Sequence, residues 1–61
     1  MNENELLAKK MIEYRARENI SAKELARRCK ISVQTVYYLE NELQTPTRFT
    51  RQKIMNVIEN K

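Results

Sequence analysis

The chain has 61 residues, enough for one small domain with a modest core. One cysteine and no histidine exclude a disulfide framework and a zinc site, and without histidine or glycine the common general base and the glycine-rich phosphate loop are missing. Twelve Lys and Arg against eight Asp and Glu give a formal net charge of +4, which favours a polyanionic partner. We therefore expect one domain over residues 1–61 that is not an enzyme and needs no metal or cofactor.

The first predicted helix covers residues 5–18. Asn2 or Asn4 can cap its N-terminus. One face carries residues at helical spacing that we expect to be buried: Leu7, Met11 and Tyr14. Asn19 is expected to end the helix, because asparagine tolerates the left-handed backbone that glycine would otherwise provide.

Residues 21–41, SAKELARRCKISVQTVYYLEN, predict two short helices joined by a tight turn. Ser21 and Glu24 form a capping-box pattern, in which the serine hydroxyl and the glutamate carboxylate each accept a hydrogen bond from the other residue's N–H. Ser32 is expected to cap the second helix. Without glycine, Lys30 must make the turn between the two helices, and Asn41 or Glu42 the turn after them.

The second helix of this pair has two different faces. Its inward stripe is expected to hold Val36, Leu39, Glu40 and Leu43. Its remaining surface holds Val33, Gln34, Tyr37, Tyr38 and Asn41, whose side chains can contact bases by hydrogen bonds or methyl packing. A last helix is predicted over residues 48–60, capped by Thr47 after Pro46, with Ile54, Val57 and Ile58 facing inward. No alternating pattern predicts a strand.

Residues 7–58 resemble the Cro/CI-type (lambda-repressor-like, XRE-family) helix-turn-helix domains. The resemblance is carried by Leu25-Ala26, Lys30-Ile31-Ser32, Val36 and Leu39-Glu40. It implies an all-α fold, a small bundle of four short helices with a central helix-turn-helix, or five helices if the chain had room for the family's last one. It also implies an ion pair between Arg15 and Glu40. Lys30 and Glu42 stand where the family has glycine, and Ala22 where it has a glutamine that helps to fix a phosphate contact.

The resemblance assigns DNA contacts to the surface around the second motif helix. Gln34 suits the N6 and N7 edge of adenine and Val33 the thymine methyl, and Tyr37 and Tyr38 complete the predicted base-reading set. The predicted phosphate contacts are Lys23, Arg27, Lys30, Ser32, Asn41, Thr45 and Arg48. On charge alone, the basic run over residues 15–30 would be interpreted as a solvated helix face. Its place beside a helix-turn-helix favours contact with DNA instead.

We therefore expect a sequence-specific regulator of transcription, a repressor of bacterial, phage or mobile-element origin. It should bind double-stranded DNA as a homodimer on a pseudo-palindromic operator. No apolar run reaches the length of a membrane span, so a cytoplasmic, nucleoid-associated protein is expected, with no small-molecule ligand evident. Two alternatives remain open: a MerR-like or excisionase-like DNA-binding module, and a small antirepressor that acts through protein–protein contact.

Overall fold

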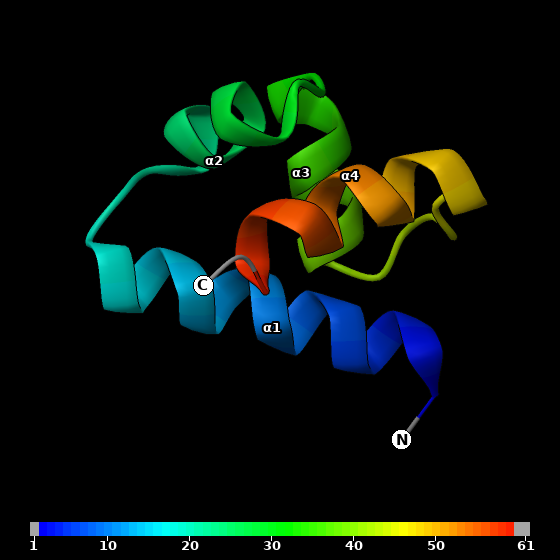
Figure 1. Ribbon diagram of the computed structural model, residues 1–61. Helices are drawn as coiled ribbons and strands as arrows, with labels where there is room; N and C mark the ends of the chain where they lie inside the picture. Colours follow the sequence, from blue (N-terminus) through cyan, green and yellow to red (C-terminus); the bar gives the residue numbers. More distant parts are fainter. Residues whose placement is uncertain (1, 60–61) are drawn as a thin grey trace.

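The computed structural model describes residues 2–59, within which the chain forms four α-helices and no strand (Figure 1). The helices are α1 (Glu3–Glu18), α2 (Ala22–Cys29), α3 (Val33–Glu40) and α4 (Arg48–Ile58). The expected all-α bundle with a central helix-turn-helix is thereby confirmed. None of the helices within residues 2–59 is both long and apolar enough to cross a membrane.

Each helix begins at a polar side chain that accepts a hydrogen bond from the first turn. Asn2, rather than Asn4, caps α1, and the helix therefore starts two residues earlier than predicted. Ser21, Ser32 and Thr47 cap the other helices, each accepting from the N–H three residues on at 3.1 Å. Such caps contribute about 1 kcal/mol each. They explain why short helices start at these positions.

The reciprocal half of the expected capping box at Ser21 is not formed. The Glu24 carboxylate instead accepts hydrogen bonds from Arg27 Nε at 2.9 Å, Arg27 Nη2 at 2.6 Å and Arg28 Nε at 3.0 Å. Bonds from a guanidinium to a carboxylate are stronger than a bond from a neutral backbone N–H. Two arginines one turn further along the helix therefore outcompete the cap.

Three turns use the left-handed backbone without any glycine. Asn19, Lys30 and Glu42 have φ values of 54°, 60° and 58°. The first two were predicted for these positions, and the third turn is made by Glu42 rather than Asn41, whose φ is −99°. A left-handed backbone costs a non-glycine residue about 1–2 kcal/mol.

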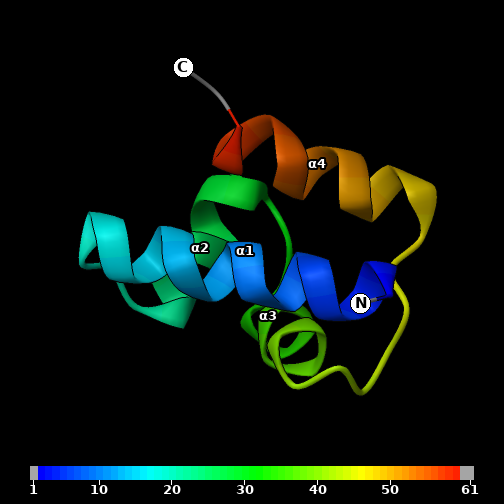
Figure 2. The same ribbon diagram turned by 90° about the horizontal axis from the view of Figure 1, so that it is seen from below.

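The core is built from all four helices. Met11, Leu25, Val36 and Ile54 come one from each helix, and each has no exposed surface. Helices α1 and α2 both pack against α3 and α4. In the view of Figure 2, α1 runs across the molecule with α4 on one side and α3 on the other. Cys29 is also buried, and burial raises the pKa of its thiol, as expected for a small core residue.

Two expectations about helix ends were wrong. Leu43 was placed on the inward stripe of α3, but its side chain is 62% exposed. The reason is that α3 ends at Glu40 and the left-handed Glu42 turns the chain away before Leu43 is reached. Helix α4 ends at Ile58 with Glu59 as its C-cap, before Asn60, which lies outside the described residues.

Candidate DNA interface

An ion pair ties the end of α3 to α1. Arg15 Nη1 lies 2.5 Å from Glu40 Oε1, and the two side chains are 29% and 10% exposed. Arg15 Nε and Glu40 Oε2 are buried and have no hydrogen-bond partner within the described part of the chain. This contact holds the C-terminal end of α3 at a set distance from α1, so the opposite side of α3 keeps a defined orientation.

The outer face of α3 begins with exposed side chains. Val33 is 48% exposed, Tyr37 is 60% exposed, and Gln34 is exposed between them. Tyr38 is half-buried, and its hydroxyl accepts a hydrogen bond from Gln34 Nε2 at 2.6 Å. Because Val36 and Leu39 take the inward face, the predicted base-reading side chains lie together on the outward side of α3.

A hollow lies between α2 and the turn that leads into α3. Its volume is about 420 Å³, and its walls include Lys23, Arg27, Ile31 and Val33. The hollow therefore places two of the predicted phosphate-binding cations beside a predicted base-reading residue.

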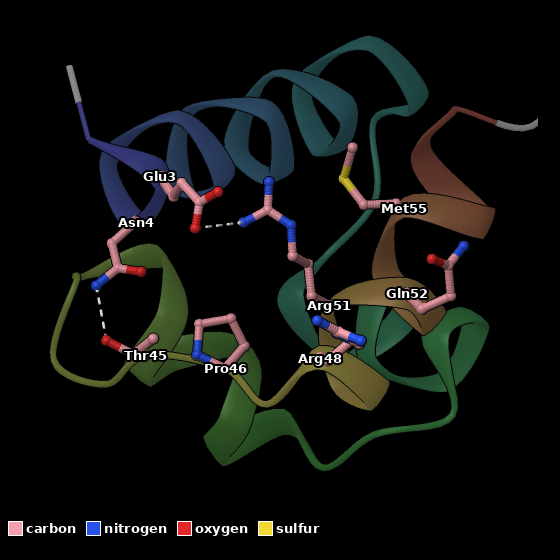
Figure 3. Close-up of a pocket in the computed structure, with 8 residues that line it drawn as sticks. All are labelled: Glu3, Asn4, Thr45, Pro46, Arg48, Arg51, Gln52 and Met55. Carbon is pink, nitrogen blue, oxygen red and sulfur yellow. Dashed lines mark hydrogen bonds and ion pairs between the residues drawn. The ribbon is translucent and has the colours of Figure 1, made fainter.

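A second hollow of about 510 Å³ lies beyond the other end of α3, between the start of α1 and the start of α4 (Figure 3). Thr45 and Arg48, both predicted phosphate contacts, line it together with Arg51. Asn4 Nδ2 donates to Thr45 Oγ1 at 2.9 Å, which leaves the threonine hydroxyl free to donate. The predicted phosphate contacts thus lie at both ends of α3.

A family model described as Helix-turn-helix matches residues 11–59, a span that includes α2, α3 and α4 whole and half of α1. The chain belongs to this Cro/CI-like helix-turn-helix family. Proteins of this family regulate transcription by binding DNA, and this helix-turn-helix chain is a DNA-binding transcription regulator. Neither the comparison with curated proteins nor the comparison with solved structures gave a match.

Much of the positive charge around the helix-turn-helix is internally paired. Hydrogen bonds from Arg27, and then from Arg28, lower the pKa of Glu24 from 4.5 to about 2. Arg28 also donates to the Tyr14 hydroxyl at 3.0 Å and lies 3.4 Å from Glu18, contacts that raise its pKa. Its role in the domain is therefore structural.

The lysines of the helix-turn-helix differ from its arginines. Lys23 and Lys30 are exposed and have no carboxylate within ion-pairing distance among residues 2–59. Arg27 is 75% exposed, but two of its donor nitrogens are occupied by Glu24. The two lysines can therefore meet a phosphate without first breaking an internal pair, whereas Arg27 must share or release Glu24.

Two of the predicted phosphate contacts also hold the helix-turn-helix together. Ser32 Oγ accepts from the Thr35 N–H and lies 2.8 Å from Thr35 Oγ1. Asn41 Nδ2 donates to the Tyr37 carbonyl at 2.8 Å, a second hydrogen bond to a carbonyl that also accepts from the Asn41 backbone N–H at 3.1 Å. Their remaining hydrogen-bonding capacity is still available to a ligand.

Sequence reasoning missed Arg51 and the hydrogen bond between Gln34 and Tyr38. Arg51 follows Arg48 by three residues at the start of α4, and both residues line the same hollow. Residues three apart on a helix are neighbours, so this spacing could have indicated that Arg51 lies beside Arg48. Gln34 and Tyr38 are four residues apart on α3, the same kind of signal.

Proposed function

We propose that this regulator is a repressor of bacterial, phage or mobile-element origin, which binds a pseudo-palindromic operator as a homodimer. The observation that carries the proposal is the outward face of α3. Its N-terminal residues Val33 and Gln34 are exposed, and the cations Lys23 and Arg27 lie beside the start of the helix. In helix-turn-helix complexes, the N-terminal residues of the second motif helix meet the base edges in the major groove.

Base readout is assigned to four side chains of α3: Val33, Gln34, Tyr37 and Tyr38. The Gln34 amide matches the donor and acceptor of adenine, and the Val33 methyl groups match the methyl of thymine. An A·T-containing core in each half-site is therefore expected. No arginine or lysine lies on α3, so the helix has no side chain for the bidentate contact that commonly recognises guanine.

Phosphate binding is assigned to the residues at both ends of α3: Lys23, Arg27, Lys30, Ser32, Asn41, Thr45 and Arg48. Four of these are cations. At a slope of about −0.9 for each neutralised phosphate, log K should fall with log salt at about −3.6 for each copy and about −7 for a dimer.

A homodimer on DNA must separate its two α3 helices by one helical turn of the duplex, about 34 Å. The described chain measures 25 × 22 × 20 Å, which is comparable with that separation, so two copies on neighbouring half-sites are close enough to touch. Leu43 and Phe49 lie in the loop after α3 and at the start of α4, and their side chains are 62% and 71% exposed. They are the proposed dimer contact, together with Met55 on α4. Contact through these few side chains implies a small interface that forms mainly on the operator.

The decisive experiment is a binding-site selection on random duplex DNA, at stated salt, followed by a salt titration on the selected site and on random duplex. A pseudo-palindrome with A·T pairs in each half and a steep negative slope is expected. As a matched control, Lys9→Ala removes an exposed cation of α1 that lines neither hollow, and it should leave the slope unchanged. A flat plot without a selected site would refute the proposal and favour action through protein–protein contact.

A further inference from the structure

The hydrogen bond between Gln34 and Tyr38 restrains the amide proposed to read a base. Gln34 Nε2 lies 2.6 Å from the Tyr38 hydroxyl, one helical turn further along α3. The tyrosine is half-buried, and its ring centroid lies 6.3 Å from that of Tyr37. An exposed glutamine would otherwise sample many rotamers and lose that freedom on binding. The tyrosine therefore holds the glutamine in one arrangement before DNA arrives.

The restraint also determines which hydrogen-bonding groups the amide presents. A glutamine amide has two N–H donors and one carbonyl acceptor. With one N–H given to Tyr38, one donor and one acceptor remain. Adenine presents the complement in the major groove, an acceptor at N7 and a donor at N6. Guanine presents two acceptors, N7 and O6, so the held carbonyl would face O6 and be repelled.

We propose that Tyr38 is a positioning residue, which fixes the orientation of the Gln34 amide and thereby sets a preference for adenine over guanine at one base position. This role replaces the direct base contact assigned to Tyr38 above, and Val33, Gln34 and Tyr37 remain the base-reading side chains. The inference rests on the proposed function, because it requires Gln34 to meet a base. The residue acts on DNA only through Gln34, and its own hydroxyl needs no contact with the duplex.

The test compares Tyr38→Phe with Tyr14→Phe, a matched control that removes the hydroxyl of a tyrosine on α1, outside the residues proposed to contact DNA. Each variant is titrated against the selected site, the same site with the Gln34-contacted A·T pair changed to G·C, and random duplex. Tyr38→Phe should lower the adenine-over-guanine ratio about tenfold, near the lower end of what one good base contact provides. The affinity of Tyr38→Phe for random duplex should stay unchanged. The control variant should keep the adenine-over-guanine ratio of wild type.

A double-mutant cycle separates positioning from direct contact. In a protein that already carries Gln34→Ala, Tyr38→Phe should have no further effect on the adenine-over-guanine ratio. An equal loss with and without Gln34 would mean that Tyr38 touches the DNA itself, and the inference would be overturned. In the free protein, the side-chain amide resonances of Gln34 should shift in Tyr38→Phe but not in Tyr14→Phe. Unshifted resonances would show that the hydrogen bond is absent in solution, and this result would also overturn the inference.

The failure of this inference can be distinguished from the failure of the proposed function. If Gln34→Ala leaves base discrimination intact, Gln34 does not read the site and the inference fails with that assignment, whereas the proposed function fails only if no operator site is selected. If Gln34→Ala abolishes discrimination at one position while the cycle is additive, the readout by Gln34 stands and only the role of Tyr38 is wrong. Thermal melts of each variant exclude unfolding as the cause of lost binding.

Discussion

Arg15→Met should destabilise the protein because it leaves the Glu40 carboxylate without a cation. The glutamate side chain is only 10% exposed and has lost most of its hydration, whereas Arg15 is 29% exposed. Breaking a buried pair from one side costs about 3–5 kcal/mol, and the partial exposure of this pair places the loss near 3 kcal/mol. Glu40→Gln should cost less, about 1–2 kcal/mol, because the guanidinium left behind is better hydrated and can still donate to the amide. Methionine keeps most of the apolar stem of Arg15, so the difference in stability between wild type and Arg15→Met reports on the lost charge rather than on lost packing.

This loss is large for a chain of 61 residues. At about 0.05–0.15 kcal/mol for each residue, the whole domain has a free energy of unfolding of about 3–9 kcal/mol. A domain of this size loses about 4–8 °C in Tm for each kcal/mol, so Arg15→Met should melt about 12–24 °C lower. Urea denaturation and thermal melts followed by far-ultraviolet circular dichroism measure both quantities.

Two further variants test whether the pair is the cause. Arg15→Met combined with Glu40→Leu removes both charges and should recover much of the loss, because no buried charge is left alone. Arg17→Met is the matched control, since its side chain is 65% exposed, 4.0 Å from Glu18 and over the Tyr14 ring at 5.3 Å, and it should cost no more than about 1 kcal/mol. If Arg15→Met melts like wild type, or if the double variant loses as much as Arg15→Met and Glu40→Leu do separately, the pair does not stabilise the fold and the reasoning is refuted.

Three other outcomes follow from the structure. Gln34→Ala should lose about 1–3 kcal/mol of discrimination at one base position and keep its salt slope, whereas Arg27→Ala should weaken binding to all duplexes alike and make the slope shallower by about 0.9 for each bound copy. Equal weakening by both variants would refute the division of roles. Hydrogen bonds from Arg27 lower the pKa of Glu24 from 4.5 to about 2, so its carboxylate stabilises the fold fully above pH 4.5 and loses this effect as the pH falls towards 2. The Tm of wild type should therefore exceed that of Glu24→Gln at pH 6, and the difference should shrink as the pH falls from 4.5 towards 2. A difference in Tm that does not change with pH would contradict a stabilising role for the Glu24 carboxylate. Glu42→Gly should stabilise the fold by about 0.5–1 kcal/mol in urea, because φ is 58° there, and Asn19→Gly should gain less, because asparagine tolerates this conformation.

The sequence by itself determined the local features of this protein. The caps at Ser21, Ser32 and Thr47 form between residues that are three apart in the sequence. The contacts that define the start of each of these helices are therefore local. The same holds for the left-handed turn at Lys30, the residue that directly follows α2, because the chain has no glycine to take that position.

Only the tertiary structure decided which partner a side chain takes when several are within reach. Helical periodicity continued past Glu40 placed Leu43 in the core, because no glycine marks where α3 stops. Arg28 reaches Glu24 within its own helix, but its further contacts with Tyr14 and Glu18 exist only because α2 lies near α1 in the fold. The hollow that joins Thr45 and Arg51 to the start of α1 depends on how α1 and α4 pack, and such long-range contacts are set by the whole core rather than by any local pattern.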